Sequence, residues 1–140
     1  MHSLQTKIRI LGVDPGFGRV GWGVVEKAGG DWTYVAHGCI ETDKKKQFIE
    51  RLREIQINLN KIIVEYKPDR AAVEDLFFYK NVKTAIAVGQ ARGVILLTLV
   101  QANLSVDEFT PLQVKQAITG YGRAEKRQLQ KLIQLQLRLK

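Results

Sequence analysis

Two acidic residues stand directly after short apolar segments that predict buried strands. Asp14 follows residues 8–13, and Glu74 follows residues 71–73. An α/β sheet usually places its site at the carboxyl ends of its strands, so neighbouring strands would bring these two carboxylates onto one metal ion. Mg²⁺ prefers oxygen ligands, typically one or two carboxylates with waters and a substrate phosphate. Asp14 and Glu74 are therefore the candidate metal ligands; the alternative is that each carboxylate only accepts hydrogen bonds at a strand end.

A loop with three aromatic residues and a lysine follows this second acid, and another lysine lies shortly beyond it. Aromatic rings beside basic side chains suit stacking on unpaired bases and contact with phosphates. The alternative for one of the phenylalanines is packing into the core beneath the loop. The candidate nucleic-acid contacts in this region are Phe77, Phe78, Tyr79, Lys80 and Lys83.

A second basic group surrounds the glycine-containing turn at residues 119–122. These side chains are expected to contact phosphates near the bond that is cut, with a lysine stabilising charge in the transition state. Ordinary solvated surface lysines are the alternative. The group consists of Lys115, Arg123, Lys126 and Arg127.

The net charge of +8 is concentrated in the second half of the chain. Residues 1–76 carry 12 basic and 11 acidic side chains, whereas residues 77–140 carry 10 and 3. A basic half beside a nearly neutral one is expected of a protein that binds the phosphate backbone of a nucleic acid. The alternative is a solvated basic helix face.

Length and composition predict one domain that spans residues 1–140, since 45% hydrophobic residues suffice for a core. Cys39 is the only cysteine, so no internal disulfide can form and a cytoplasmic setting is expected. No apolar run approaches the ~18 residues of a membrane helix. Lys7 and Arg9 interrupt any signal-peptide core. We therefore expect no membrane partner.

The first half of the chain predicts an antiparallel meander followed by a helix. Gly29-Gly30 is a hairpin turn between two of the strands. Apolar residues then recur at steps of three and four from Phe48 to Tyr66, which predicts a helix of about five turns that Pro68 ends. The three predicted strands occupy residues 8–13, 20–25 and 32–41.

The second half alternates between helix and strand, so we expect an α/β fold: a five-stranded mixed sheet with helices on both faces. The helix at residues 82–101 carries small residues four apart, Ala85, Gly89 and Gly93, along which another backbone could approach closely. The other predicted elements are strands at residues 71–73 and 106–109 and helices at residues 112–118 and 124–140.

These segments, in order and with the expected spacing, resemble the RuvC family of Holliday-junction resolvases. The resemblance covers essentially the whole chain. It implies an RNase H-like fold and a homodimeric, Mg²⁺-dependent crossover junction endodeoxyribonuclease of recombination and DNA repair. The segments are Ile10-Leu-Gly-Val-Asp-Pro-Gly16, Gly21-Trp-Gly-Val-Val25, Val73-Glu-Asp-Leu-Phe-Phe78 with Lys80-Asn81, Gly89-Gln-Ala-Arg-Gly93, Pro111-Leu-Gln-Val-Lys-Gln116 and Gly120-Tyr-Gly-Arg-Ala-Glu-Lys126.

The resemblance also implies roles for single residues. Asp14 and Glu74 match the family's first two catalytic acids, Lys115 and Lys126 its active-site basic residues, and Phe77 the aromatic that engages bases at the crossover. The helix with the small-residue stripe matches the dimer contact. Two Mg²⁺ ions per site are implied, for which Mn²⁺ could substitute. Two opposed strands would be cut symmetrically, leaving 5′-phosphate and 3′-hydroxyl ends, and a branch-migration motor would be a partner.

The resemblance is incomplete near the C-terminus. The family carries two further carboxylates on a helix there, whereas nothing after Glu125 is acidic in this chain. We therefore expect a truncated chain that lacks the family's C-terminal helix, binds junction DNA and cuts it poorly. Two other functions stay open: a junction-binding module without catalysis, and an RNase H-like nuclease that processes ribosomal RNA precursors.

Overall fold

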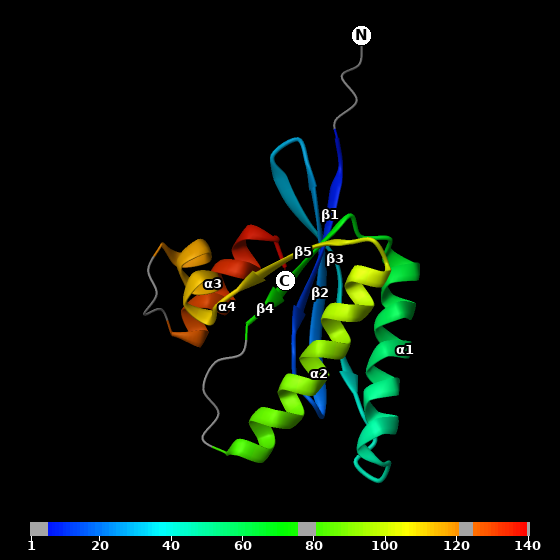
Figure 1. Cartoon of the computed structure of the whole chain (residues 1–140). Coiled ribbons are helices and arrows are strands. Elements are labelled where there is room, and N and C mark those ends of the chain that lie inside the picture. Colours follow the sequence, from blue (N-terminus) through cyan, green and yellow to red (C-terminus); the bar gives the residue numbers. More distant parts are fainter. Residues whose placement is uncertain (1–5, 76–80, 121–124, 140) are drawn as a thin grey trace.

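The computed structural model describes residues 6–75, 81–120 and 125–139. Its centre is one five-stranded sheet in the order β3-β2-β1-β4-β5 (Figure 1). β1, β2 and β3 form the expected antiparallel meander, while β1 pairs with β4, and β4 with β5, in parallel. The mixed sheet predicted from the sequence is therefore confirmed. The strands are β1 (Ile8–Asp14), β2 (Arg19–Ala28), β3 (Asp31–Glu41), β4 (Arg70–Glu74) and β5 (Ser105–Phe109).

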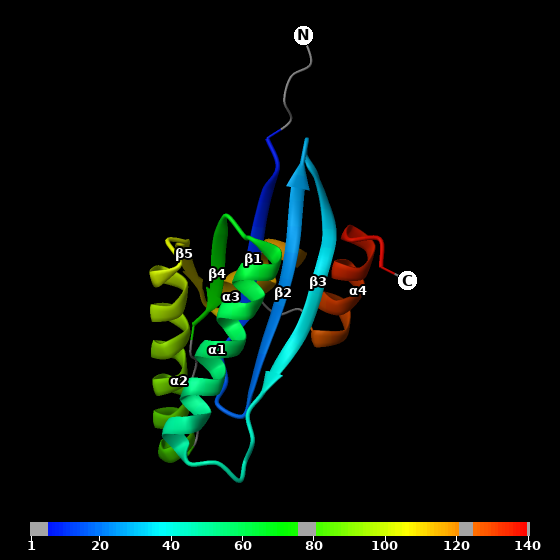
Figure 2. The same ribbon diagram turned by 90° about the vertical axis from the view of Figure 1, so that its right-hand side faces the viewer.

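Helices cover both faces of the sheet, as expected (Figures 1 and 2). α1 (Phe48–Tyr66) and α2 (Val82–Gln101) lie side by side over one face, which we call the rear face. α3 (Pro111–Thr119) and α4 (Lys126–Gln136) lie over the other, which we call the front face. The helix predicted as far as Lys140 is shorter than expected, because Arg138 takes a left-handed φ of 53°. Its N–H and that of Leu139 bond back to the carbonyls of Leu135 and Gln134, which closes the helix end.

The alternation of side chains along β1 separates the core from the front face. Leu11 and Val13 are buried in the core on the rear face, so Gly12 and Asp14 point to the front. The apolar stripe predicted for α1 supplies the opposing layer. The core beneath the helices also contains Val24, Ile55, Leu59, Val73, Ala91, Ile95 and Leu99.

α2 is apolar along most of its length. It has the length and the mean hydropathy, 1.4, of a membrane-spanning helix, so the expectation that no such segment exists is wrong for this element. This is weak evidence for a membrane span, because a core helix of a soluble protein passes the same test. α2 contributes Val88, Ala91, Ile95 and Leu99 to the buried core.

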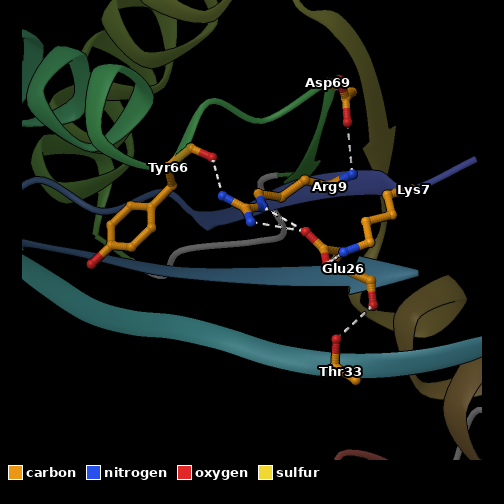
Figure 3. A network of polar contacts seen from close by, with 6 residues as sticks. All are labelled: Lys7, Arg9, Glu26, Thr33, Tyr66 and Asp69. Atoms are coloured by element: carbon orange, nitrogen blue, oxygen red, sulfur yellow. Dashed lines mark hydrogen bonds and ion pairs between the residues drawn. The ribbon is translucent and has the colours of Figure 1, made fainter. Parts of the chain in front are cut away.

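A polar network centred on Arg9 ties β1 to its neighbours (Figure 3). The guanidinium donates to Glu26 of β2 at 3.1 and 2.8 Å and to the carbonyl of Tyr66, the last residue of α1, at 2.7 Å. The Arg9 backbone N–H donates to the Asp69 carboxylate at 2.8 Å, and the Asp69 N–H returns a 2.8 Å bond to the Arg9 carbonyl. These contacts fix where β4 begins beside β1, and therefore where both strands end.

Removing this network should destabilise the fold. In Arg9→Met we expect the free energy of unfolding in urea to fall by about 1.5–3 kcal/mol, the range for a lost hydrogen bond to a charged group. The Glu26 side chain is only 18% exposed and would lose its closest partner. Arg19→Met is the control, since the Arg19–Glu41 pair is 74% and 66% exposed and should contribute little to stability. Equal losses in the two variants would contradict this assignment.

Candidate active site

The parallel pairing of β1 with β4 brings Asp14 and Glu74 together. Val13 pairs with Val73, so the next residue on each strand lies at the same edge of the sheet. The two carboxyl groups share a hydrogen bond on the front face. The expectation that neighbouring strand ends bring these acids together is confirmed.

The tight turn after β1 depends on Gly16. A Cβ there would lie 2.1 Å from the carbonyl oxygen of Arg19, which is closer than any side chain can approach. Only glycine therefore allows the chain to reverse so soon after Asp14. The Asp-Pro-Gly segment of the sequence thus ends β1 at its acidic residue and begins the tight turn that leads into β2.

The Glu74 carboxyl has a strongly perturbed acidity. Its pKa is raised to about 7, first by burial and then by the negative charge of Asp14 and the hydrogen bond with it. The positive charge of Lys115 on α3 acts in the opposite direction and favours the ionised form. Near neutral pH the metal-free pair therefore tends to keep a proton that an ordinary glutamate would have lost.

Lys115 lies on a well-capped helix that follows β5 directly. The Thr110 hydroxyl accepts from the Gln113 N–H at 3.1 Å, the Gln113 side chain accepts from the Thr110 N–H at 2.9 Å, and Pro111 occupies the first helical turn. α3 then lies on the front face, and the positive charge of Lys115 on this helix acts on the Glu74 carboxyl. Within the second basic group, Lys115 is thus a residue whose charge lowers the pKa of Glu74.

A shallow cavity of about 370 Å³ lies on the front face beside the two acids. Gly12, Gly21 and Gly23 form part of its floor, because Gly12 pairs with Gly23 and Asp14 pairs with Gly21. Val114 of α3 and Phe109 of β5 form its far wall. The sequence analysis did not predict this cavity. The available signal was the alternation of Gly21 and Gly23 along β2, with Gly12 of β1 paired to Gly23.

The remaining predicted residues are not gathered at this site by the part of the chain that the structure describes. Lys126 and Arg127 begin α4 and are exposed, and neither lines the cavity beside the acids. Lys83 is exposed in the first turn of α2. Their roles stay predictions. The other predicted contacts lie outside the described residues: Phe77, Phe78, Tyr79, Lys80 and Arg123.

The donor set suits a hard divalent cation. Asp14 and Glu74 offer carboxylate oxygens at adjacent strand ends, and carboxylate oxygens are ligands that Mg²⁺ prefers. Within residues 6–75, 81–120 and 125–139, no group of three or more His, Cys, Asp or Glu side chains could hold a metal ion. A cation here would therefore keep several positions for water and substrate oxygens.

Comparison with known proteins agrees with this geometry. The family description "Crossover junction endodeoxyribonuclease RuvC" matches residues 10–140. The chain belongs to the RuvC family. The RuvC of Petrotoga mobilis is 53% identical over 130 residues, which are 93% of this chain and 80% of that protein.

Solved structures give the same relationship. Thermus thermophilus RuvC in complex with a Holliday junction substrate superposes with a TM-score of 0.89 at 30% identity, over 95% of this chain and 81% of that one. The yeast mitochondrial Holliday junction resolvase Ydc2 shares the fold alone, with a TM-score of 0.70 at 11% identity over 97% of this chain and 65% of that one. The RNase H-like fold expected from the sequence is confirmed, and this RuvC-family chain is shorter than these relatives.

The shared proton predicts a pH-dependent stability for the metal-free protein. The folded-state pKa of Glu74 lies above its ordinary value of 4.5, so this group's stabilising contribution is complete below pH 4.5 and is lost as pH rises through about 7. Glu74→Gln cannot ionise and should not show this loss. We expect the parent to become less stable than Glu74→Gln as pH rises from 4.5 to 7, measured by denaturant unfolding in EDTA.

Taking the difference between these two proteins cancels the contributions of titrating groups that are remote from the Asp14–Glu74 pair. Glu54, for example, acts in the opposite sense, because its hydrogen bond with Lys46 lowers its pKa. A difference that stays constant across this pH range would show that Glu74 ionises normally.

Proposed function

We propose that this chain binds four-way junction DNA and resolves it by metal-dependent hydrolysis of two opposed strands, leaving 5′-phosphate and 3′-hydroxyl ends. The observation that carries the proposal is the pair Asp14 and Glu74 at adjacent strand ends, on which the positive charge of Lys115 also acts. The junction complex of Thermus thermophilus RuvC names the substrate of a 30% identical relative. We also propose that residues 1–140 form a single nuclease domain of the cytoplasm.

Asp14 and Glu74 are the proposed metal ligands. Nucleases of this family depend on divalent metal ions. We propose Mg²⁺, two ions per site, with Mn²⁺ as a substitute. When bound, these cations would supply an activated water and neutralise charge on the leaving oxygen. On metal binding the two carboxylates would release their shared proton, and the cation would offset the repulsion between them.

Lys115 is the proposed cation for the substrate phosphate. The positive charge of Lys115 acts on the Glu74 carboxyl, so it would also attract a phosphodiester bound at the two acids. A fixed positive charge in this partly enclosed place would stabilise the extra negative charge of the transition state. Lys126 is proposed to assist from the start of α4.

The loop after Glu74 is proposed to engage the unpaired bases of the crossover. It follows the metal ligand directly in the sequence, so a base held there would be close to the bond that is cut. Phe77 is the proposed wedge, with Phe78 and Tyr79 beside it. The proposed phosphate contacts are Lys80, Lys83, Arg123 and Arg127.

The chain is proposed to act as a homodimer through α2. The exposed side of this helix is apolar, with Ile86 57% and Leu97 55% exposed, and Gly93 lies between them in open space. Ala85 and Gly89 are half-buried along the edge of this stripe. A two-fold dimer would place two active sites symmetrically on a two-fold junction. A branch-migration motor is the proposed further partner.

Replacing the first metal ligand should separate binding from cutting. In Asp14→Asn we expect symmetric, metal-dependent nicking of a synthetic four-way junction to fall by at least ~100-fold, since several kcal/mol of charge stabilisation depend on the metal. Junction affinity in EDTA, measured by fluorescence anisotropy, should be unchanged. Lys61→Met on the rear helix α1 is a control that should cut like the parent. If Asp14→Asn nicks the junction as fast as the parent, the proposed site is wrong. Preferential binding of structured RNA over the junction would favour the alternative of an RNA-processing nuclease.

The proposed dimer face is tested by introducing charge. Ile86→Glu combined with Leu97→Glu should convert the dimer into a monomer in sedimentation velocity, because two carboxylates would be buried in each subunit's interface. Val64→Glu is the matched control, since Val64 is 72% exposed on α1 and lies outside the stripe. A parent that sediments as a monomer, or a double variant that remains dimeric, would exclude this interface.

A further inference from the structure

A half-buried cation contacts the back of the strand that carries Glu74. Arg92 lies on α2 with its side chain 15% exposed, and its Nη2 is 3.2 Å from the Asp75 carboxylate. The same nitrogen contacts the carboxylate of Glu108 on β5. A single guanidinium therefore joins a helix to the ends of two parallel strands.

These contacts bracket Glu74 along the sheet. Asp75 is the next residue in the chain, and its N–H donates to the Phe109 carbonyl at 2.6 Å. Glu108 pairs with Val73, the residue before Glu74, while Phe109 pairs with Glu74 itself. The strand that carries the acid is thus held immediately before and after it.

The alternation of side chains explains why the cation lies behind the site. Glu74 points to the front face, where it meets Asp14. Its neighbour Asp75 meets Arg92 of α2, a helix that covers the rear face. Asp75 and Glu108, two other acids near the strand ends, therefore pair with Arg92 on the rear face. Arg92 acts on the site only through the backbone.

We propose that Arg92 is a positioning residue for the reaction: it clamps the ends of β4 and β5 from the rear face and so holds Glu74 in line with Asp14. This inference rests on the proposed function, because Glu74 needs a fixed position only as a metal ligand. The two acids repel each other when ionised, and β4 is only five residues long and ends at Glu74. A clamp at its tip resists the separation that this repulsion would cause.

The chain contains a matched control for the clamp. Arg70 and Asp107 form a 3.1 Å ion pair between the same two strands, β4 and β5, at the other end of β4. Replacing Arg70 therefore removes an Arg–carboxylate bridge between the same strands without touching the end that carries Glu74. The two bridges differ in place and in exposure, since Arg70 is 48% exposed.

The test compares Arg92→Met with Arg70→Met in the DNA-free protein. Methionine keeps most of the side-chain volume, and the Asp75 and Glu108 side chains are 46% and 48% exposed, so they stay solvated. We expect Arg92→Met to weaken Mn²⁺ binding, followed by electron paramagnetic resonance, by about tenfold or more. The Asp75 amide should also exchange faster with solvent. Junction affinity in EDTA should stay at the parent value, and Arg70→Met should bind Mn²⁺ like the parent.

Three outcomes would overturn the inference. Parental Mn²⁺ affinity in Arg92→Met, with binding lost in Asp14→Asn, would show that the clamp is not needed. An equal loss in Arg70→Met would show a general effect of strand pairing. Parental affinity in Asp14→Asn would instead refute the proposed metal site itself, and the positioning role with it. Should Arg92→Met fail to fold, Glu108→Gln removes one anchor of the clamp and should weaken Mn²⁺ binding in the same direction.

Discussion

Parallel hydrogen bonding between β1 and β4 is the constraint on which the site depends. Two parallel neighbours have their carboxyl ends at one edge of the sheet, so the residues after Val13 and Val73 must meet. Such a pair also requires a crossover, which β2, β3 and α1 supply between them. The Arg9 network at the opposite end of β1 holds the start of β4 in register with β1. The positions of Asp14 and Glu74 follow from this pairing.

The pairing brings two acidic side chains together, and their repulsion is reduced by features of the surrounding structure. Burial and the charge of Asp14 raise the pKa of Glu74, so metal-free protein keeps a proton that the bound cation would replace. Lys115 partly offsets the negative charge from the front, and Arg92 fixes the backbone from the rear. The glycine floor beside the acids leaves space for a substrate on the front face. The site is therefore a pair of acids at adjacent strand ends whose mutual repulsion a proton or a cation relieves.

Much of this arrangement could be predicted from the sequence, because it depends on local patterns. The steps of three and four from Phe48 to Tyr66 gave the bounds of α1, and the apolar runs before Asp14 and Glu74 gave the two strand ends. The rest depends on contacts between distant segments. The Arg92 clamp requires the crossing of α2 over the sheet, which no local pattern reports. The end of α4 depends on a left-handed Arg138, a conformation that the sequence does not signal with glycine.

The same β1–β4 pairing determines when the active site forms during folding. β1 and β2 are consecutive hairpin partners, whereas β1 and β4 are separated by about sixty residues, as the bond from Arg9 to Asp69 shows. Closing so long a loop costs more conformational entropy than forming a hairpin, so the meander can form while β4 is still being synthesised. The two acids meet only when β4 has paired with β1. A nascent or partly unfolded chain in which this pairing has not formed therefore lacks the proposed metal site.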